Sequence, residues 1–356
     1  MATGFFDLQA SRAEAYERIV VVGDIHGCSA GFLRVLRLAE LLDERGRWQA
    51  GSHTYLVVCG DMIDEGSESR GVISLLRSLQ QQAKDRVIVL LGNHELLLLR
   101  TLLSDSDAVN WETVHSWADV DEDLKALLDD NAVPMLRTAT MQQWFQHSLI
   151  TTGRVDYPND YLAACARIPQ SIAKTAAHLL HRAMAKDGTL SWLLGLPVAA
   201  QLGDWGFFHG GPPSDFSGDI AALNREFTAQ LMAHQWNHPL LDPYAGRSSP
   251  TATRGWSNDG EENVDALLRS YGINQVAFGH SPGAINGIFG RLAQRWGKVF
   301  KADSYFSLGV EGFLEIIVGK VWAVYSEEGR CVYHKLYPDH PPLRQAELLW
   351  DGERCK

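Results

Sequence analysis

Three short polar motifs, each directly after an apolar run rich in β-forming residues, constrain the fold more than any other feature. The motifs and the runs before them are Ile19–Val22 with GDIHG at Gly23–Gly27, Tyr55–Cys59 with GDMID at Gly60–Asp64, and Val87–Leu91 with GNHE at Gly92–Glu95. Helical spacing predicts amphipathic helices between them, one from Phe32 to Leu42 and one near Gly71–Gln82. This β-α-β-α-β order predicts parallel strands with right-handed crossovers, and the polar motifs at one sheet edge.

The remaining chain divides into a helical segment and a second group of strands. Residues 101–203 are acidic, rich in Leu and Ala, and interrupted by Pro and Gly; they predict a helical insertion or cap without a strong strand, with one helix at 171–186. Strands are expected again at Trp205–Phe208, Gln275–Phe278, Phe313–Val318 and Val321–Tyr325. We therefore expect a catalytic domain over residues 17–330 and an extended C-terminal tail over residues 331–356.

Composition excludes several classes of protein. The net charge of −11 argues against a nucleic-acid groove, which needs a basic face. The five cysteines are scattered and form no CxxC pair, which is typical of reduced thiols. No run approaches the ~18 apolar residues of a membrane span, and the first residues lack the apolar core of a secretory signal. A cytoplasmic protein without a membrane or nucleic-acid partner is expected.

Side chains in the three motifs, and two histidines that follow later strands, form a candidate site for two divalent metals. The candidate ligands are Asp24, His26, Asp61, Asn93, His209 and His280. Asp24 and His26 lie two residues apart in a tight turn and can face one ion, whereas Asp61 follows its strand directly and can bridge two. Mixed oxygen and nitrogen ligands without thiolate favour manganese, iron or zinc, manganese first. Two ions ~3.5–4 Å apart can activate a shared water and neutralise a transferring phosphoryl group.

Three further side chains are candidates for catalysis and phosphate binding. His94 lies beside a ligand position and is expected to be a general acid for the leaving oxygen, oriented by Asp64. Arg254, in the segment TATRGWS, is a candidate phosphate clamp because a guanidinium matches phosphate oxygens. A structural ion pair is an equally good interpretation of Arg254.

The ordered series GDIHG, GDxxD, GNHE, HGG, RG and GH resembles the PPP-type phosphoprotein phosphatases of the calcineurin-like metallophosphoesterase superfamily. The segment GDMIDEGSESRGVISLL is most similar to the branch called Shewanella-like protein phosphatases. The resemblance is strong over residues 17–100 and limited to short motifs over 205–330. It implies an αββα sandwich with a helical insertion and a dinuclear metal centre at the sheet edge. It also implies one metal on Asp24, His26 and Asp61, a second on Asp61, Asn93, His209 and His280, and catalytic or phosphate-binding roles for His94, Asp64 and Arg254.

Position 65 departs from the family pattern. The family reads GDxxDRG, with the arginine gripping phosphate, whereas this chain has Glu65. Exchanging a cation for an anion changes the local charge by two units, which in a partly desolvated site weakens phosphate binding. We expect Arg70 or Arg254 to compensate, or Glu65 to turn to solvent or pair with Arg70.

Three functions follow from these observations. The leading one is a metal-dependent phosphomonoesterase acting on phosphoprotein or a small phosphoester, by attack of a metal-bridging hydroxide with His94 as acid; the residue type that carries the phosphate stays open. The second is a dinucleoside polyphosphate hydrolase, whose family shares GDxHGC-like and GNH motifs. The third is a non-catalytic binding module that retains the metals, for which Glu65 is the best argument.

Overall fold

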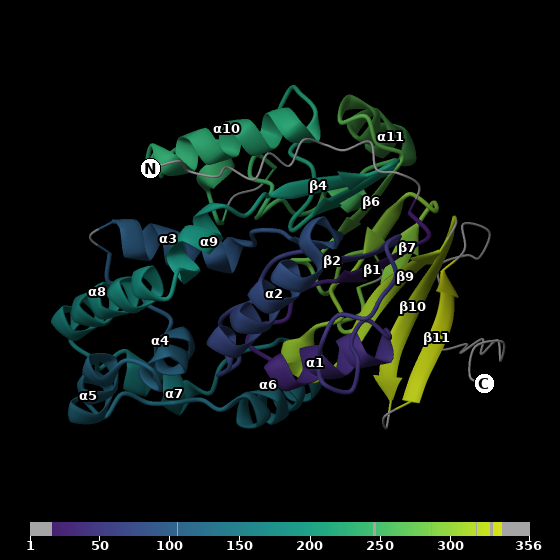
Figure 1. Ribbon diagram of the computed structural model, residues 1–356. Helices are drawn as coiled ribbons and strands as arrows, with labels where there is room; N and C mark the ends of the chain where they lie inside the picture. The colour runs from purple at the N-terminus through teal and green to yellow at the C-terminus, as the bar shows by residue number, and fades with distance from the viewer. Residues whose placement is uncertain are drawn as a thin grey trace.

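The computed structural model describes residues 16–104, 106–244, 247–285, 287–317, 319–327 and 330–336. Their strands form two sheets packed face to face, with helices on the outer side of each, as Figure 1 shows. Helices α1 (Ser29–Leu38) and α2 (Ser69–Ala83) cover one sheet, and α10 (Ile220–Met232) and α11 (Glu261–Ser270) cover the other. The layer order is therefore the predicted αββα sandwich.

The first sheet is built on the three strands that carry the polar motifs. Its order is β11-β10-β9-β1-β2-β3. Strands β1 (Arg18–Val22), β2 (Thr54–Val58) and β3 (Val87–Val89) are parallel, as predicted. The antiparallel strands β9 (Gly312–Ile317), β10 (Lys320–Glu327) and β11 (Arg330–Leu336) extend the sheet beyond β1.

The second sheet brings two later motifs to the same end of the molecule. Its order is β4-β5-β6-β8-β7. Strands β5 (Trp205–Phe208) and β6 (Gln275–Phe278) are parallel, so His209 and His280 both follow the carboxyl end of a strand. The other three strands are β4 (Ala199–Leu202), β7 (Ala293–Arg295) and β8 (Val299–Lys301).

Alternating burial along β1 explains why two layers pack on this strand. Ile19 and Val21 contact apolar side chains of the second sheet, whereas Val20 and Val22 pack with α1 and α2. All four are fully buried. Because both faces are covered, the strand reads as a continuous apolar run instead of an alternating one. Burying each such side chain contributes roughly 1.5–3 kcal/mol.

The insertion is mainly helical, as predicted. Helix α3 (Asn93–Leu103) leads into it. After it come α4 (Trp111–Ala118), α5 (Glu122–Asp130), α6 (Thr138–Thr152), α7 (Asn159–Cys165), α8 (Gln170–Lys186) and α9 (Thr189–Leu194).

Single 3-10 turns lie at Lys84–Arg86, Pro239–Leu241, Trp256–Asn258 and Phe306–Leu308. No helix in the described ranges is long and apolar enough to cross a membrane.

Two predicted boundaries differ from the structure. The sequence predicts no strong strand in the segment 101–203, whereas its last residues form β4, which pairs antiparallel with β5. The sequence predicts an extended tail from residue 331, whereas residues up to Leu336 form β11. Neither strand has a strong signal in its own sequence. Each is stabilised by pairing with a neighbouring strand, β4 with β5 and β11 with β10, and this pairing is a tertiary contact. The rest of the predicted tail, residues 337–356, lies outside the described residues.

Candidate metal centre

The structure brings the six predicted ligands together at one edge of the two sheets. Asp24 and His26 follow β1, Asp61 follows β2, and Asn93 begins the helix after β3. His209 and His280 reach the same place from β5 and β6. All six side chains are buried. Parallel strands whose carboxyl ends meet at one edge produce this convergence.

Two groups of donor atoms that overlap at Asp61 lie at this edge. The ligand atoms of Asp24, His26 and Asp61 lie within 4.8 Å of one another, and so do those of Asp61, His209 and His280. His209 Nε2 lies 3.2 Å from Asp61 Oδ2, and His26 Nε2 lies 3.9 Å from the same oxygen. His209 Nε2 also lies 3.0 Å from the Asn93 Oδ1 atom. Asp61 thus belongs to both groups, which is the geometry of two neighbouring cation sites with one shared carboxylate.

The imidazole rings are held with one nitrogen available. His26 Nδ1 lies 3.0 Å from the carbonyl oxygen of Ile63, and His209 Nδ1 lies 2.8 Å from that of Cys59. A ring that donates its Nδ1–H to a carbonyl presents the lone pair of Nε2, as metal-binding histidines do. The Nε2 atom of His280 is buried without a hydrogen-bond partner. These donors fit divalent metals of the first transition row.

The charges in the cluster also fit cations. Burial, together with the carboxylates of Asp303, Asp61 and Glu65, raises the pKa of Asp24 well above its usual value. Burial and the neighbouring His209 and Arg254 lower the pKa of His280 to about 2, so this ring is neutral. Crowded buried carboxylates beside the neutral imidazole of His280 are costly unless they coordinate positive charge.

Asp303 is a buried carboxylate that the sequence did not single out. Burial raises its pKa, and its Oδ2 atom has no hydrogen-bond partner. Its Oδ1 atom accepts from the backbone N–H of Tyr305 at 2.9 Å. It lies after β8, a three-residue strand without a clear sequence signal. The side chain adds negative charge next to Asp24, which increases the need for a cation there.

The motif loops show close backbone contacts at two glycines and left-handed conformations at several other residues. A Cβ atom on Gly92 would collide with Asp61 Oδ1, and one on Gly279 would collide with Asp24 Oδ1. Left-handed φ values occur at the non-glycine residues His26, Asp61, Asp64, Glu65 and His280. Such conformations cost of order 1–3 kcal/mol each and persist where the surrounding structure imposes them. The loops therefore fix the direction of the donor atoms.

Glu95 fixes two of these loops to each other. Its carboxylate accepts the backbone N–H groups of Gly92, Asp61, Met62 and Ile63 at distances of 2.9, 3.0, 2.8 and 3.2 Å. The signal that would have found it is its place three residues after Gly92, as in a capping box. Removing Glu95 would leave four buried donors unpaired.

His94 and Asp64 lie together, as predicted, beside the candidate metal ligands. His94 Nδ1 lies 2.8 Å from Asp64 Oδ2, and His94 Nε2 lies 3.9 Å from Asp61 Oδ2. Burial opposes protonation of His94, but the carboxylates of Asp61 and Asp64 outweigh it and raise its pKa to about 10. The His94 side chain is 25% exposed. The ring therefore faces the cluster and can be reached by a substrate.

The helical insertion contributes directly to this pair. Thr113 in α4 donates its hydroxyl to Asp64 Oδ1 at 2.5 Å. The hydroxyl of Ser69 accepts the backbone N–H of Asp64 at 3.1 Å and lies 3.1 Å from Thr113 Oγ1. Both hydroxyls are buried. Sequence reasoning missed Thr113 because no motif surrounds it.

Arg254 lies at the open side of the second group of donors. Its Nη2 atom is 3.5 Å from His280 Nδ1, and its Nη1 atom is 3.4 Å from the hydroxyl oxygen of Ser281. The residue is exposed. Within the described ranges it forms no ion pair with a carboxylate, so the structure does not support the interpretation as a structural ion pair.

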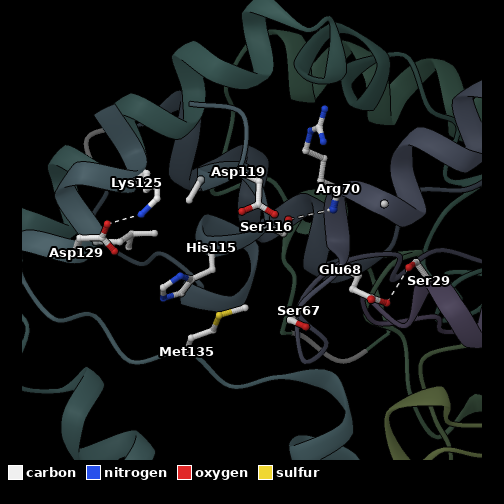
Figure 2. A pocket seen from close by; sticks show the side chains of 13 residues that line it. Ser29, Ser67, Glu68, Arg70, His115, Ser116, Asp119, Lys125, Asp129 and Met135 are labelled. Carbon is white, nitrogen blue, oxygen red and sulfur yellow. Dashed lines mark hydrogen bonds and ion pairs between the residues drawn. The ribbon is translucent and has the colours of Figure 1, made fainter. Parts of the chain in front are cut away.

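The sequence predicts that Glu65 could turn to solvent or pair with Arg70, and the structure shows neither. The Glu65 side chain is only 18% exposed, and its Oε1 atom lies 3.9 Å from His26 Nε2. Glu65 Oε2 and Arg70 Nε are both buried without a hydrogen-bond partner among the described residues. Arg70 lines a cavity of about 410 Å³ with Ser116 of α4 and with Asp119, which directly follows that helix. Figure 2 shows the Arg70 guanidinium pointing away from Ser67 and Glu68. This lining contains none of the six ligands, so a phosphate-binding role for Arg70 stays a prediction.

Comparisons with known proteins agree with this geometry. A family model described as calcineurin-like phosphoesterase matches residues 17–284. Shewanella-like protein phosphatase 2 of Arabidopsis thaliana is 29% identical over 32% of this chain and 29% of its own length. The symmetrical bis(5'-nucleosyl)-tetraphosphatase of Buchnera aphidicola is 30% identical over 30% of this chain and 41% of its own. The matched segment thus spans less than half of either relative.

A solved structure with the same fold covers most of the chain. The cold-active protein-tyrosine phosphatase of a psychrophile Shewanella species has a TM-score of 0.56 and 19% identity, and the match covers 91% of this chain and 81% of that one. This similarity confirms the predicted fold. The sequence match to Shewanella-like protein phosphatases confirms the resemblance predicted from the motifs.

Proposed function

The chain belongs to the calcineurin-like phosphoesterase family, and on this premise we propose that it is a metal-dependent phosphomonoesterase that acts on phosphorylated protein. The observation that carries the proposal is the pair of donor groups sharing Asp61, with His94 and Asp64 directly beside them. The names of the Shewanella-like phosphatase relatives support phosphoprotein as the substrate class.

Each donor group would hold one ion. Asp24, His26 and Asp61 would hold the first, and Asp61, Asn93, His209 and His280 the second, with manganese favoured over iron and zinc. When bound, the two ions would polarise the phosphoryl oxygens and lower the pKa of the attacking water.

The protein's own groups would protonate the leaving oxygen and orient the phosphate. His94 donates the Nε2 proton to the leaving oxygen while the P–O bond breaks, and Asp64 at Nδ1 keeps the ring in the correct orientation. Thr113 holds the Asp64 carboxylate from the other side. Arg254 has an exposed guanidinium beside His280 and binds non-bridging phosphoryl oxygens.

Dinucleoside polyphosphate hydrolysis is the second candidate function. It is favoured by the match to the bis(5'-nucleosyl)-tetraphosphatase, which is 30% identical where it aligns. A binding module without catalysis is disfavoured, because the His94–Asp64 contact and all six donors are retained.

A substrate panel tests the proposal. The full chain, loaded in turn with manganese, iron or zinc, is assayed on phosphotyrosine, phosphoserine and phosphothreonine peptides, an aryl phosphate and diadenosine tetraphosphate. We expect the highest kcat/KM on a phosphopeptide and a strong loss in Asp24→Asn. Faster cleavage of diadenosine tetraphosphate would favour the second candidate, and no hydrolysis of any ester with both metals bound would refute catalysis.

A further inference from the structure

Glu65 has the surroundings of a metal ligand. Asp64 and Glu65 have consecutive left-handed φ values of 67° and 57°, which turn the Glu65 side chain inward. The next residue, Gly66, donates its backbone N–H to the carbonyl oxygen of His26 at 3.0 Å. A Cβ atom on Gly66 would collide with that oxygen. The loop is therefore held against His26, and the direction of Glu65 is fixed by the backbone.

Among the described residues, no lysine or arginine forms an ion pair with the Glu65 carboxylate. Its Oε2 atom is buried without a hydrogen-bond partner. The cationic group in its surroundings is the His94 imidazole: Glu65 contributes to the raised pKa of His94, and their ligand atoms lie within 4.8 Å of each other, but no hydrogen bond reaches Glu65 Oε2. An unpaired buried carboxylate oxygen is expensive, so an outside cation is the natural partner.

His26, a candidate ligand of the first metal group, lies close to Glu65. Glu65 Oε1 lies 3.9 Å from His26 Nε2, the same distance that separates His26 Nε2 from Asp61 Oδ2. The ligand atoms of His26, Glu65 and His94 all lie within 4.8 Å of one another. Metal–ligand bonds of about 2.0–2.2 Å place neighbouring donor atoms roughly 3–4 Å apart.

His26 belongs to two donor groups, one with Asp24 and Asp61 and one with Glu65 and His94, and a single ion at its Nε2 atom can draw on both. Its Nδ1 atom faces the carbonyl oxygen of Ile63, which leaves Nε2 as the single donor atom of the ring. A single nitrogen lone pair binds one ion. His94 is engaged by Asp64 through Nδ1 and serves as the acid in the proposed mechanism. We propose that Glu65 is a fourth protein ligand of the ion held by Asp24, His26 and Asp61; this inference rests on the proposed two-metal function.

A third carboxylate on this ion has chemical consequences. Asp24, Asp61 and Glu65 together bring three negative charges to one divalent cation, which favours tight binding and hard, oxygen-preferring ions such as manganese. The carboxylate of Glu65 takes a coordination position that would otherwise be open to solvent or to a phosphate oxygen. The first ion therefore exchanges slowly and contributes less to phosphate affinity than the second.

The test is a metal titration that does not depend on activity. The metal-free full chain and its Glu65→Gln variant are titrated with manganese by equilibrium dialysis, and bound metal is measured by mass spectrometry. We expect two ions per chain in the wild type, and in Glu65→Gln at least a tenfold weaker affinity for one of them with the other unchanged. Glu68→Gln is the matched control, since it removes the same charge from an exposed position in the same loop and should change neither affinity.

The outcomes separate this inference from the proposed function. Wild-type affinity for both ions in Glu65→Gln overturns the inference alone, including the case in which Glu65 attracts a cationic group of the substrate. Fewer than two ions on the wild type would overturn the two-metal function and the inference with it. If Glu65→Gln does not fold, Glu65→Asp provides the same comparison, because it keeps the charge but withdraws the carboxylate by one methylene; we expect it also to weaken one site.

Discussion

Thr113→Val should slow catalysis although Thr113 contacts no metal ligand and lies in the insertion. The substitution keeps the shape and removes the hydroxyl that donates to Asp64 Oδ1 at 2.5 Å. Asp64 is buried, and a hydrogen bond to a charged group contributes about 1.5–3 kcal/mol. If that energy orients the carboxylate against His94, its loss raises the barrier by a similar amount. Because about 1.4 kcal/mol of activation free energy changes a rate tenfold, we expect kcat to fall by roughly 10- to 100-fold.

The assay compares two leaving groups. An alkyl or peptide phosphoester needs a proton on its leaving oxygen, whereas an aryl ester with a good leaving group needs little. Thr113→Val should therefore lose more on the first substrate than on the second, with two metals still bound and with Thr113→Ser close to wild type. Ser116→Ala is the control, because it removes a hydroxyl of the same helix whose one hydrogen bond among the described residues is from the backbone N–H of Arg70, at 3.0 Å. Equal losses on both substrates, or a wild-type rate, would refute a role through Asp64.

Four further results are expected. His94→Asn should slow alkyl phosphoesters by about 10²–10⁴-fold and aryl esters far less, with metal content near two; equal losses would make His94 structural or a ligand. Asp61→Asn should lose most activity and lower the bound-metal count, and full occupancy with a normal rate would contradict its bridging position. Glu65→Arg, assayed at saturating metal, should lower the KM for a simple aryl phosphate and strengthen inhibition by phosphate, whereas unchanged inhibition would count against it. Burial raises the pKa of Glu112 to about 7, so the protonated form stabilises the fold at acid pH and this contribution is lost as pH rises from about 4.5 through 7. The test is the free energy of unfolding of the metal-free protein, measured by chemical denaturation at pH 5 and pH 8. Between these pH values, the free energy of unfolding of Glu112→Gln should rise by up to about 3 kcal/mol relative to that of the wild type. Parallel pH profiles of the two proteins would contradict this.

The sequence determined the parallel strands and the positions of the donor residues. Each GDIHG-type motif follows an apolar run, and both features are local, so a pattern of a few residues was sufficient. Asp24, Asp61 and Asn93 had to meet because parallel strands end at a common edge. The same rule placed His209 and His280, although a different sheet carries them.

The tertiary structure alone decided which distant groups complete the site. Thr113 meets Asp64 across 49 positions of sequence, and Asp303 joins Asp24 from a strand with no clear signal. The sequence left the direction of the Glu65 side chain open between solvent and an ion pair with Arg70. The left-handed loop and the contact of Gly66 with His26 turn it toward the donors instead. Periodicity reports which face a residue occupies on its own element, whereas these contacts depend on how separate elements pack, which no local pattern records.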